Sequence, residues 1–391
     1  MRPSVHLIES KQASVLRGHP WIFPKAIAKT KGRLITGELV DVVSHEGETI
    51  CTGVFNEHSL YRVRVLAYRG EFDDEKLCFA DIIKRRLQQA WQVRNALNLP
   101  NASTNAFRLC NSEGDGLSGL TIDYFNAVCV VSSSAYWVEK NRELITECIE
   151  EFTQCQSLIW LSQAKPLAQD GWQEIESSNI ALQTEVLEAG VQFAVDFTQT
   201  QKTGLFLDQR ENHQRVAALA KGKRVLDLYT YTGGFALHAA KAGASHVTAI
   251  DSSKAAIQQA SANARLNQLD IIEFIEDDAR NYLTNAGDYD IVVLDPPKLI
   301  PSRQNLQRAK NYYRFLHREV FKAMRSGSLL MTCNCSSAIS AQEFAALVAA
   351  QASAVGKQAR VLGVYGPASC HPVLPAFPEG NYLTAILLAV L

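Results

Sequence analysis

Hydrophobic residues recur along the chain with different spacings, and each change of spacing marks a division of the sequence. Apolar and polar residues alternate in the short runs 38–43, 49–55 and 61–66, which are separated by glycine turns. A period of two is typical of half-buried strands. We therefore expect a small β-barrel domain over residues 1–70.

A helical spacing follows this β-rich segment and predicts a connector helix. Its apolar stripe consists of Phe79, Ile83, Leu87, Trp91 and Val93. Beyond it, strand-like runs at 107–110, 120–123 and 128–131 precede a helical run at 139–152. These patterns predict a central α+β domain, which together with the connector spans residues 71–187.

Strand-like and helical segments then alternate regularly, which defines a third domain over residues 188–391. The expected strands are 224–229, 246–251, 271–276, 290–295 and 328–332, and the expected helices are 235–242, 254–269 and 307–324. Such alternation builds a parallel sheet covered by helices on both faces. Segments 359–365 and 381–391 can add antiparallel strands at one edge. The expected fold class is α/β, with a Rossmann-like domain last.

Charge is nearly balanced over the 391 residues, with 39 Lys and Arg against 40 Asp and Glu, so the chain has no general basic coat. Residues 1–94 carry a local excess of 15 basic over 11 acidic residues. The stretch between Glu9 and Glu38 lacks acidic residues and places Trp21 and Phe23 between two prolines. This stretch is either a nucleic-acid-binding surface or a solvated loop with Trp21 in a small core.

Targeting signals and disulfide patterns are missing from the sequence. No run of 18 apolar residues occurs and no signal-peptide core follows Met1, so we expect a cytoplasmic protein. The nine cysteines are odd in number and scattered irregularly, unlike a disulfide framework. Only Cys333 and Cys335 are closely spaced, and a zinc site needs more ligands than this pair. We expect no bound metal.

Glycines and carboxylates follow successive strands of the Rossmann-like domain. Gly233 and Gly234 come after the first strand, Asp251 ends the second, Asp278 follows the third and Asp295 follows the fourth. Ligands of such sheets bind beyond the carboxyl ends of the strands, where a strand-end carboxylate can accept hydrogen bonds from ribose hydroxyls. The turn after the first strand shows neither the G-x-G-x-x-G pattern of dinucleotide-binding enzymes nor the phosphate-binding loop of nucleotide triphosphate enzymes. These features predict an adenosine-type ligand, although Gly-Gly alone also occurs in simple turns.

Together these motifs resemble class I S-adenosylmethionine (SAM)-dependent methyltransferases, through Asp227-x-Tyr229-x-Tyr231-Thr232-Gly233-Gly234-Phe235 and Asp295-Pro296-Pro297-Lys298. More narrowly, segments 202–210 (KTGLFLDQR) and 332–336 (TCNCS) resemble bacterial RlmI-type 23S ribosomal RNA cytosine-5 methyltransferases. In that family an RNA-binding PUA domain comes first, which matches the basic β-rich segment. The resemblance extends over the whole chain.

The resemblance implies a role for each residue of the cofactor site. Asp251 would hold the ribose of SAM, Asp278 the adenine amino group, and the Gly233-Gly234 turn the methionine portion, while Asp227 and Tyr229 belong to the same motif. Arg210 is a candidate partner of the methionine carboxylate by charge and position. A simpler alternative is that Asp208 and Glu211 form a capping box at the start of a helix, with Arg210 in solvent.

Cytosine methylation at carbon 5 requires a thiolate that adds to carbon 6 of the base. Strand alternation puts Cys333 and Cys335 on the same side, so spacing does not choose between them. The family's Cys-Ser pair matches Cys335-Ser336, and the resemblance therefore implies Cys335. Lys298 is a candidate cation to lower the thiol pKa, and Asp295 could bind the cytosine ring. A buried structural thiol at Cys335 and a turn-forming carboxylate at Asp295 are the simpler alternatives.

The resulting prediction is a SAM-dependent enzyme that forms 5-methylcytosine in large-subunit ribosomal RNA. Two alternatives compete with it: an adenine or guanine amino-group RNA methyltransferase, and a noncatalytic RNA-binding protein. The first typically has an aromatic residue where this chain has Lys298, and the second has no need of the cofactor motifs. The sequence leaves open the target nucleotide, the base that removes the carbon-5 proton, and whether the protein forms a homodimer.

Overall fold

The computed structural model describes residues 2–72, 78–174, 183–198, 205–298 and 305–391. These residues form two compact units, each described here by itself. Unit 1 contains residues 1–101, 105–182 and 370–380. Unit 2 contains residues 102–104, 183–369 and 381–391. The sequence motif around Lys202, Thr203 and Gly204 lies outside the described residues.

Unit 1 begins with a six-stranded sheet in the order β2-β6-β5-β4-β1-β3. Its strands are β1 (Ser4–Leu7), β2 (Trp21–Ile22), β3 (Ile27–Lys31), β4 (Leu39–Val43), β5 (Thr49–Phe55) and β6 (Val63–Tyr68). Alternate residues of these strands, such as Val5, Val40 and Val63, form one buried core. The sequence analysis did not predict helix α1 (Glu9–Leu16), because little of it is apolar and only Gln12 and Val15 are buried.

The aromatic residues of the basic stretch have different environments. Trp21 packs against Tyr61, with ring centroids 4.0 Å apart, and against Phe377 at 4.5 Å. Its Nε1 donates to Glu113 Oε1 and Ser118 Oγ, each at 3.1 Å. Trp21 is therefore half-buried in an aromatic cluster, whereas Phe23 keeps 44% of its surface exposed, and nucleic-acid binding by this stretch stays a prediction.

A four-stranded sheet with the order β10-β9-β8-β7 forms the rest of unit 1. Its elements are α2 (Phe79–Ala96), β7 (Ala106–Asn111), β8 (Leu120–Phe125), β9 (Val128–Ser133), α3 (Tyr136–Lys140), α4 (Arg142–Thr153), β10 (Ser157–Ser162) and α5 (Ala164–Gln169). The helix predicted at 139–152 is two helices that meet at Asn141. In α2 the predicted apolar stripe is wrong at Val93, which is 44% exposed. The fully buried Arg94 lies beside it and binds Asp115 through two hydrogen bonds of 2.6 and 2.7 Å.

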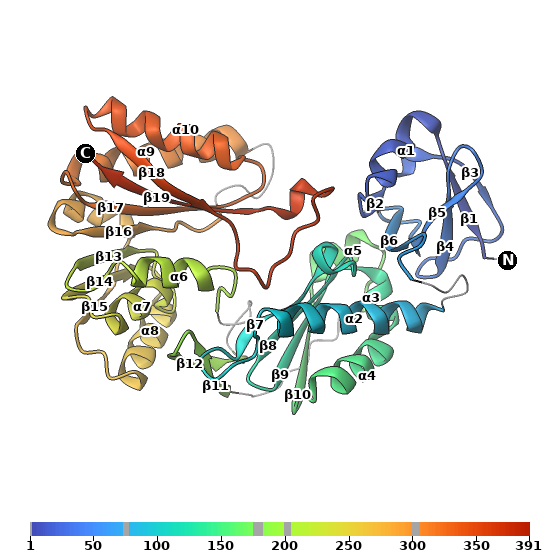
Figure 1. Ribbon diagram of the computed structural model, residues 1–391, viewed down its shortest axis with the longest axis horizontal. Coiled ribbons are helices and arrows are strands. Elements are labelled where there is room, and N and C mark those ends of the chain that lie inside the picture. The colour runs from blue at the N-terminus through green and yellow to red at the C-terminus, as the bar shows by residue number, and fades with distance from the viewer. Residues whose placement is uncertain (1, 73–77, 175–182, 199–204, 299–304) are drawn as a thin grey trace. The chain divides into compact units, whose positions relative to one another are not determined.

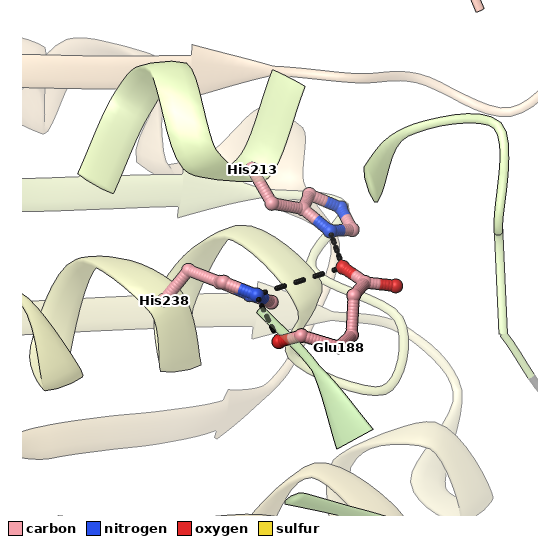
Figure 2. A group of neighbouring side chains, drawn as sticks. All are labelled: Glu188, His213 and His238. Atoms are coloured by element: carbon pink, nitrogen blue, oxygen red, sulfur yellow. Dashed lines mark hydrogen bonds and ion pairs between the residues drawn. The ribbon is translucent and has the colours of Figure 1, made fainter. Parts of the chain in front are cut away.

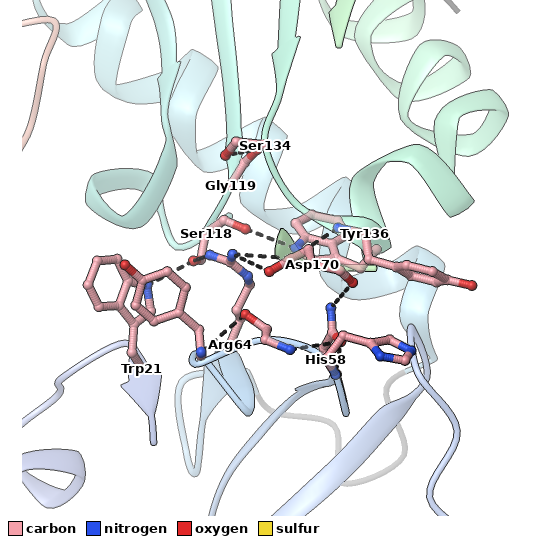
Figure 3. A network of polar contacts seen from close by, with 12 residues as sticks. Trp21, His58, Arg64, Ser118, Gly119, Ser134, Tyr136 and Asp170 are labelled. Atoms are coloured by element: carbon pink, nitrogen blue, oxygen red, sulfur yellow. Dashed lines mark hydrogen bonds and ion pairs between the residues drawn. The ribbon is translucent and has the colours of Figure 1, made fainter. Parts of the chain in front are cut away.

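Polar contacts join the two sheets of unit 1 (Figure 3). Arg64 of β6 donates to Ser118 Oγ at 3.0 Å and forms an ion pair with Asp170 at 3.3 Å. Asn56 Nδ2 donates to the backbone oxygen of Asp170 at 2.9 Å. Both members of the ion pair are buried, so removal of either one would leave an uncompensated charge and loosen this junction.

Unit 2 is built on a seven-stranded sheet in the order β15-β14-β13-β16-β17-β19-β18, preceded by the hairpin β11-β12 (Figure 1). Its strands are β11 (Gln183–Glu188), β12 (Val191–Asp196), β13 (Arg224–Leu228), β14 (His246–Asp251), β15 (Ile272–Glu276), β16 (Ile291–Leu294), β17 (Leu329–Cys335), β18 (Ala359–Tyr365) and β19 (Leu383–Val390). The five strands from β15 to β17 are parallel, and β19 and β18 continue the sheet antiparallel. The predicted parallel sheet with an antiparallel edge is confirmed.

Helices cover both faces of the seven-stranded sheet (Figure 1). They are α6 (Arg210–Ala217), α7 (Gly234–Lys241), α8 (Lys254–Leu266), the 3-10 segment η3 (Ala279–Asp288), α9 (Leu306–Ala323) and α10 (Ala341–Ala354). One core lies between the sheet and α9, α10 and η3, and another lies between the sheet and α6 and α7. Among the described helices, none is long and apolar enough to cross a membrane.

Candidate active site

The order of the parallel strands creates a switch point between β13 and β16. From β13 the chain proceeds outward to β14 and β15, and it then returns to place β16 and β17 on the other side of β13. Ligands of doubly wound sheets bind at such a point, beyond the carboxyl ends of the strands. Each site residue predicted from a strand end therefore belongs to the same edge of this sheet.

The turn after β13 carries the two predicted glycines. Gly233 has φ +92° and precedes α7, and Tyr229 and Tyr231 also adopt positive φ angles of +69° and +51°. Non-glycine residues seldom adopt this conformation, so the surrounding contacts must stabilise it. Part of that support comes from the Gly233 N–H, which donates to Thr230 O at 2.9 Å.

Asp227 lies beneath this turn with 1% of its surface exposed. Its Oδ2 accepts hydrogen bonds from Thr230 Oγ1 at 2.6 Å and from the Ala236 N–H at 3.1 Å. Burial raises the pKa of Asp227 to about 6, although its hydrogen bond with Thr230 acts in the opposite direction. The carboxyl group thus ties the turn to the first turn of α7.

Asp251 and Asp278 end or follow the next two strands. Asp251 accepts hydrogen bonds from the Tyr231 N–H at 3.0 Å and from the Ser253 N–H at 2.9 Å, so it joins the end of β14 to the glycine turn. Asp278 is the N-cap of η3 and forms an ion pair with Arg280, whose side-chain hydrogen bond lowers the pKa of Asp278. The structure brings Asp251 to the turn and places Asp278 against a cation that the sequence analysis did not consider.

Asp295 follows β16 and faces the end of β17. Its Oδ2 accepts a hydrogen bond from Gln209 Nε2 at 2.9 Å, and its Oδ1 lies 3.9 Å from Cys335 Sγ. Burial raises the pKa of Asp295 to about 7, and the negative charges of Asp208 and Asp227 add to this shift. A carboxyl group with such a pKa can both donate and accept a proton near neutral pH.

The two cysteines of β17 point to the same side of the sheet but differ in depth. Cys333 is fully buried within the core beneath α6 and α7, whereas Cys335 is only partly buried at the edge of that core. Burial raises the pKa of Cys333 well above its usual value, followed in importance by the charge of Asp295. Of the two thiols, the structure therefore leaves only Cys335 partly accessible and holds Cys333 as a neutral core residue.

The start of α6 corrects one alternative from the sequence. α6 begins at Arg210 and has no side-chain cap, so the predicted capping box is wrong. Asp208 instead accepts a hydrogen bond from the Tyr382 hydroxyl at 2.6 Å, and Glu211 accepts one from the Ser369 N–H at 2.8 Å. Arg210 is buried, with 6% of its surface exposed, rather than in solvent.

Lys298 and Tyr229 are the two remaining site residues predicted from the sequence. Lys298 is exposed and directly precedes residues 299–304, which are outside the described part of the chain, so its effect on Cys335 stays a prediction. The Tyr229 hydroxyl lies 3.4 Å from that of Tyr312, and burial raises the pKa of Tyr229.

Two groups of residues escaped the sequence analysis. Gln209, which orients Asp295, stands within the quoted DQR motif, but only its place in space shows its contact. Glu188, His213 and His238 form a buried cluster behind Gly234 (Figure 2), and they come from separate elements with no local pattern to connect them.

Comparisons with known proteins agree with this geometry. Residues 117–363 match the model of a family described as S-adenosylmethionine-dependent methyltransferases, and residues 5–68 match that of a PUA-like domain. The ribosomal RNA large subunit methyltransferase I of Aeromonas salmonicida is 34% identical over 395 residues, with 98% of each chain covered. The chain belongs to the ribosomal RNA large subunit methyltransferase I family. The enzyme of that name from Escherichia coli is 30% identical, again with 98% of each chain covered.

Solved structures confirm the fold of this family member. A methyltransferase in complex with SAH superimposes with a TM-score of 0.82 over 99% of both chains at 19% identity. A protein from Streptococcus mutans, described as a SAM-dependent methyltransferase, gives a TM-score of 0.80 over the same share at 18% identity. The predictions of the family, of the PUA-like and Rossmann-like domains and of SAM as cofactor are confirmed.

Proposed function

We propose that this member of the methyltransferase I family forms 5-methylcytosine in 23S ribosomal RNA of the large subunit, through a covalent bond between Cys335 and the base. One observation carries the proposal: the partly exposed Cys335 thiol lies 3.9 Å from Asp295, at the sheet edge where the glycine turn and Asp251 also end. The names of the full-length relatives supply the class of RNA.

The described residues fit SAM by the chemistry of their donor set. The carboxylate of Asp251 stands at a strand end, where it can accept hydrogen bonds from both ribose hydroxyls. The Gly233-Gly234 turn lets the backbone approach the methionine portion closely, and the buried Arg210 is the candidate partner of its carboxylate. Asp227 would support the turn from beneath through its hydrogen bond with the Ala236 N–H. Asp278 would accept a hydrogen bond from the adenine amino group in competition with its ion pair to Arg280.

The reaction divides between the cofactor and the side chains of this chain. SAM supplies an electrophilic methyl group. The Cys335 thiolate adds to carbon 6 of cytosine, which makes carbon 5 nucleophilic enough to take that methyl group. The carbon-5 proton then leaves to a base, and the bond between Sγ and carbon 6 breaks to restore the thiolate. Asp295 would hydrogen-bond the ring nitrogen while the adduct exists, which its pKa of about 7 permits.

We propose that residues 1–70 act as the RNA-binding domain, with residues 71–187 as the central domain and 188–391 as the catalytic one. Lys29 and Lys31 are exposed on β3, where they can bind phosphate groups without base specificity. A base within a duplex must be flipped out before Cys335 can reach it, and grip on the flanking RNA would stabilise that conformation. Because ribosomal RNA is the proposed substrate, we propose that the reaction takes place in the cytoplasm.

A mechanism-based trap tests the proposal directly. We expect large-subunit ribosomal RNA that contains 5-fluorocytidine to form a covalent complex with the enzyme in the presence of SAM, because fluorine at carbon 5 cannot leave as a proton. A denaturing gel detects the complex, and mass spectrometry locates the modified residue. The complex should form with Cys333→Ala and not with Cys335→Ala. An adduct on Cys333, or methylation of normal RNA without any trapped complex, would overturn the mechanism.

The placement of SAM leads to a prediction about Asp251. We expect Asp251→Ala to weaken SAM binding by about 10- to 100-fold, because hydrogen bonds to a charged group contribute about 1.5–3 kcal/mol. Isothermal titration calorimetry without RNA measures this change. Glu276→Ala, at the exposed end of the neighbouring β15, serves as the matched control. An unchanged dissociation constant for Asp251→Ala in a protein with normal thermal stability would contradict the assigned ribose contact.

A further inference from the structure

The cluster of Glu188, His213 and His238 is buried and polar (Figure 2). Glu188 ends β11, His213 belongs to α6 and His238 to α7, and between 1% and 6% of each residue's surface is exposed. His213 Nδ1 lies 2.6 Å from Glu188 Oε1. His238 Nε2 lies 2.9 Å from the backbone oxygen of Glu188 and 3.6 Å from its Oε1, and His238 Nδ1 lies 2.8 Å from Gly234 O.

A count of ring protons shows which protonation state satisfies the hydrogen bonds of this cluster. Three ring nitrogens face oxygen acceptors at hydrogen-bonding distance, so three N–H groups are required. Two neutral imidazoles supply only two N–H groups, because each carries a single ring proton. All three contacts are hydrogen bonds at the same time only when the cluster carries one imidazolium, and both nitrogens of His238 have backbone acceptors that this ion can satisfy. The Glu188 carboxylate, which contacts both rings, neutralises the charge.

Hydrogen bonding explains the distances better than metal binding does. A zinc ion lies about 2.0–2.1 Å from its nitrogen and oxygen ligands, so atoms 2.6 Å apart would subtend an angle of roughly 80° at the metal instead of the tetrahedral value of about 109°. The 2.6 Å separation is instead typical of a short, charge-assisted hydrogen bond. The cluster is arranged to share a proton.

The same cluster contacts Gly234, the first residue of α7, from two sides. The carbonyl group of Gly234 accepts the hydrogen bond from His238 Nδ1. A Cβ atom on Gly234 would lie 2.5 Å from the His213 ring, so the ring packs directly on the glycine backbone. His213 also meets the ring of Phe235 edge to face, with centroids 4.5 Å apart. The position of the glycine turn therefore depends on these two histidines.

Other charged groups surround the cluster and influence its titration. Arg210 of α6 acts on Glu188, and Asp227 of β13 and Asp295 after β16 interact with His213. Lys241 of α7 donates a hydrogen bond to Gly190 O, two residues beyond Glu188.

The neighbours of each group determine how readily the shared proton leaves. Burial lowers the pKa of His238, and the charge of Glu188 opposes this shift. Burial alone would raise the pKa of Glu188, but its hydrogen bond with His213 and its electrostatic interactions with both histidines lower it below its usual value. The carboxylate therefore persists at acidic pH, while the imidazolium is the form that is lost as the pH rises.

We propose that Glu188, His213 and His238 are positioning residues that hold the Gly233-Gly234 turn in its SAM-binding conformation only while the cluster retains its extra proton. A neutral His238 has only one N–H group, so one of its ring nitrogens then faces a backbone carbonyl oxygen with a lone pair. His238 therefore loses its hydrogen bond to the carbonyl group of either Gly234 or Glu188. SAM affinity then falls as the pH rises. The inference rests on the proposed place of the methionine portion beside this turn.

Because burial lowers the pKa of His238 below its usual value, calorimetric SAM titrations of the full chain between pH 5 and pH 8, without RNA, test the pH dependence. We expect the dissociation constant of the parent protein to rise about tenfold over this range, the effect of one lost hydrogen bond. In His238→Gln it should stay constant, because the amide of glutamine does not titrate. Glu188→Gln should bind weakly at every pH, because it lacks the counterion. Glu185→Gln, on the same strand β11 but exposed, should follow the parent protein.

All these proteins share any titration of SAM itself, so differences between them report on the cluster. A parent dissociation constant that stays flat with pH, or a His238→Gln profile equal to that of the parent, would overturn the proposal. Stoichiometric zinc in the purified protein, with weaker SAM binding after chelation, would also overturn it in favour of a metal site.

Nuclear magnetic resonance of labelled histidines keeps the test independent of SAM and of the stability of the variants. Because burial lowers the pKa of His238, we expect one imidazole with both nitrogens protonated at pH 5, identified by its loss in His238→Gln. A His238 that is still neutral at pH 5 would refute the proton count. These measurements use neither RNA nor Cys335, so a failed 5-fluorocytidine trap and a failed proton count are distinguishable.

Discussion

Replacement of Cys335 by alanine is expected to lower methyl transfer to protein-free large-subunit ribosomal RNA on the order of 10³-fold or more, because carbon 5 of cytosine is not nucleophilic until a thiolate has added to carbon 6. SAM binding should remain within about twofold of the parent value, since the residues assigned to the cofactor lie on elements other than β17. Transfer of a radiolabelled methyl group measures the first quantity, and calorimetry measures the second.

Cys333→Ala provides the matched control, two residues earlier on the same strand. Its thiol is fully buried in the core, so we expect near-parent activity together with a lower free energy of unfolding, by about 1–2 kcal/mol. Full activity in Cys335→Ala would refute covalent catalysis by this residue. Loss of activity in Cys333→Ala, without loss of stability, would reassign the nucleophile to the inner thiol.

Asp295→Asn is expected to produce the second largest loss, about 10²- to 10⁴-fold in kcat/KM, which is the usual contribution of a positioned acid or base. Asparagine keeps the hydrogen-bonding shape beside Gln209 but cannot exchange a proton with the cytosine ring. The single-turnover rate of methyl transfer measures this loss. Asp290→Asn, before the opposite end of β16, is the control and should remain active.

The pH dependence gives a more specific signature of Asp295. Burial raises its pKa to about 7, and the form that donates to the ring nitrogen is the protonated one. The activity of the parent should therefore decline as the pH rises above about 7. The residual activity of Asp295→Asn should lack the alkaline decline. A decline with the same midpoint in the variant would assign that limb to another group.

Several features of this protein follow from the sequence alone. The alternation of strand and helix from residue 224 onward predicts a parallel sheet, because periods of 2 and 3.6 residues report which side of each element is buried. Glycines and carboxylates just after strands predict the ligand edge, because parallel strands all end on the same side. The motifs at these strand ends indicated the methyltransferase family, and the comparisons with known proteins confirmed this prediction.

Tertiary structure decided what local patterns leave open. Cys333 and Cys335 share a face by alternation, and only the packing of α6 and α7 shows that the first is covered and the second is partly accessible. Tyr382 and Ser369, more than 150 residues beyond the start of α6, donate hydrogen bonds to Asp208 and Glu211. These carboxylates therefore do not form the capping box that the local spacing favoured.

The cluster behind the glycine turn shows the limit of sequence reasoning most clearly. Glu188 contacts residues 25 and 50 positions later, and no short-range pattern joins a strand end to two separate helices. In this chain, the local spacing of hydrophobic residues determined the strands and helices, and the residues that follow each strand determined which polar groups stand at its end. Burial and hydrogen bonding between distant segments determined which thiol is accessible, which carboxyl group carries a raised pKa and where a proton is shared, because these properties depend on neighbours that only the folded chain brings together.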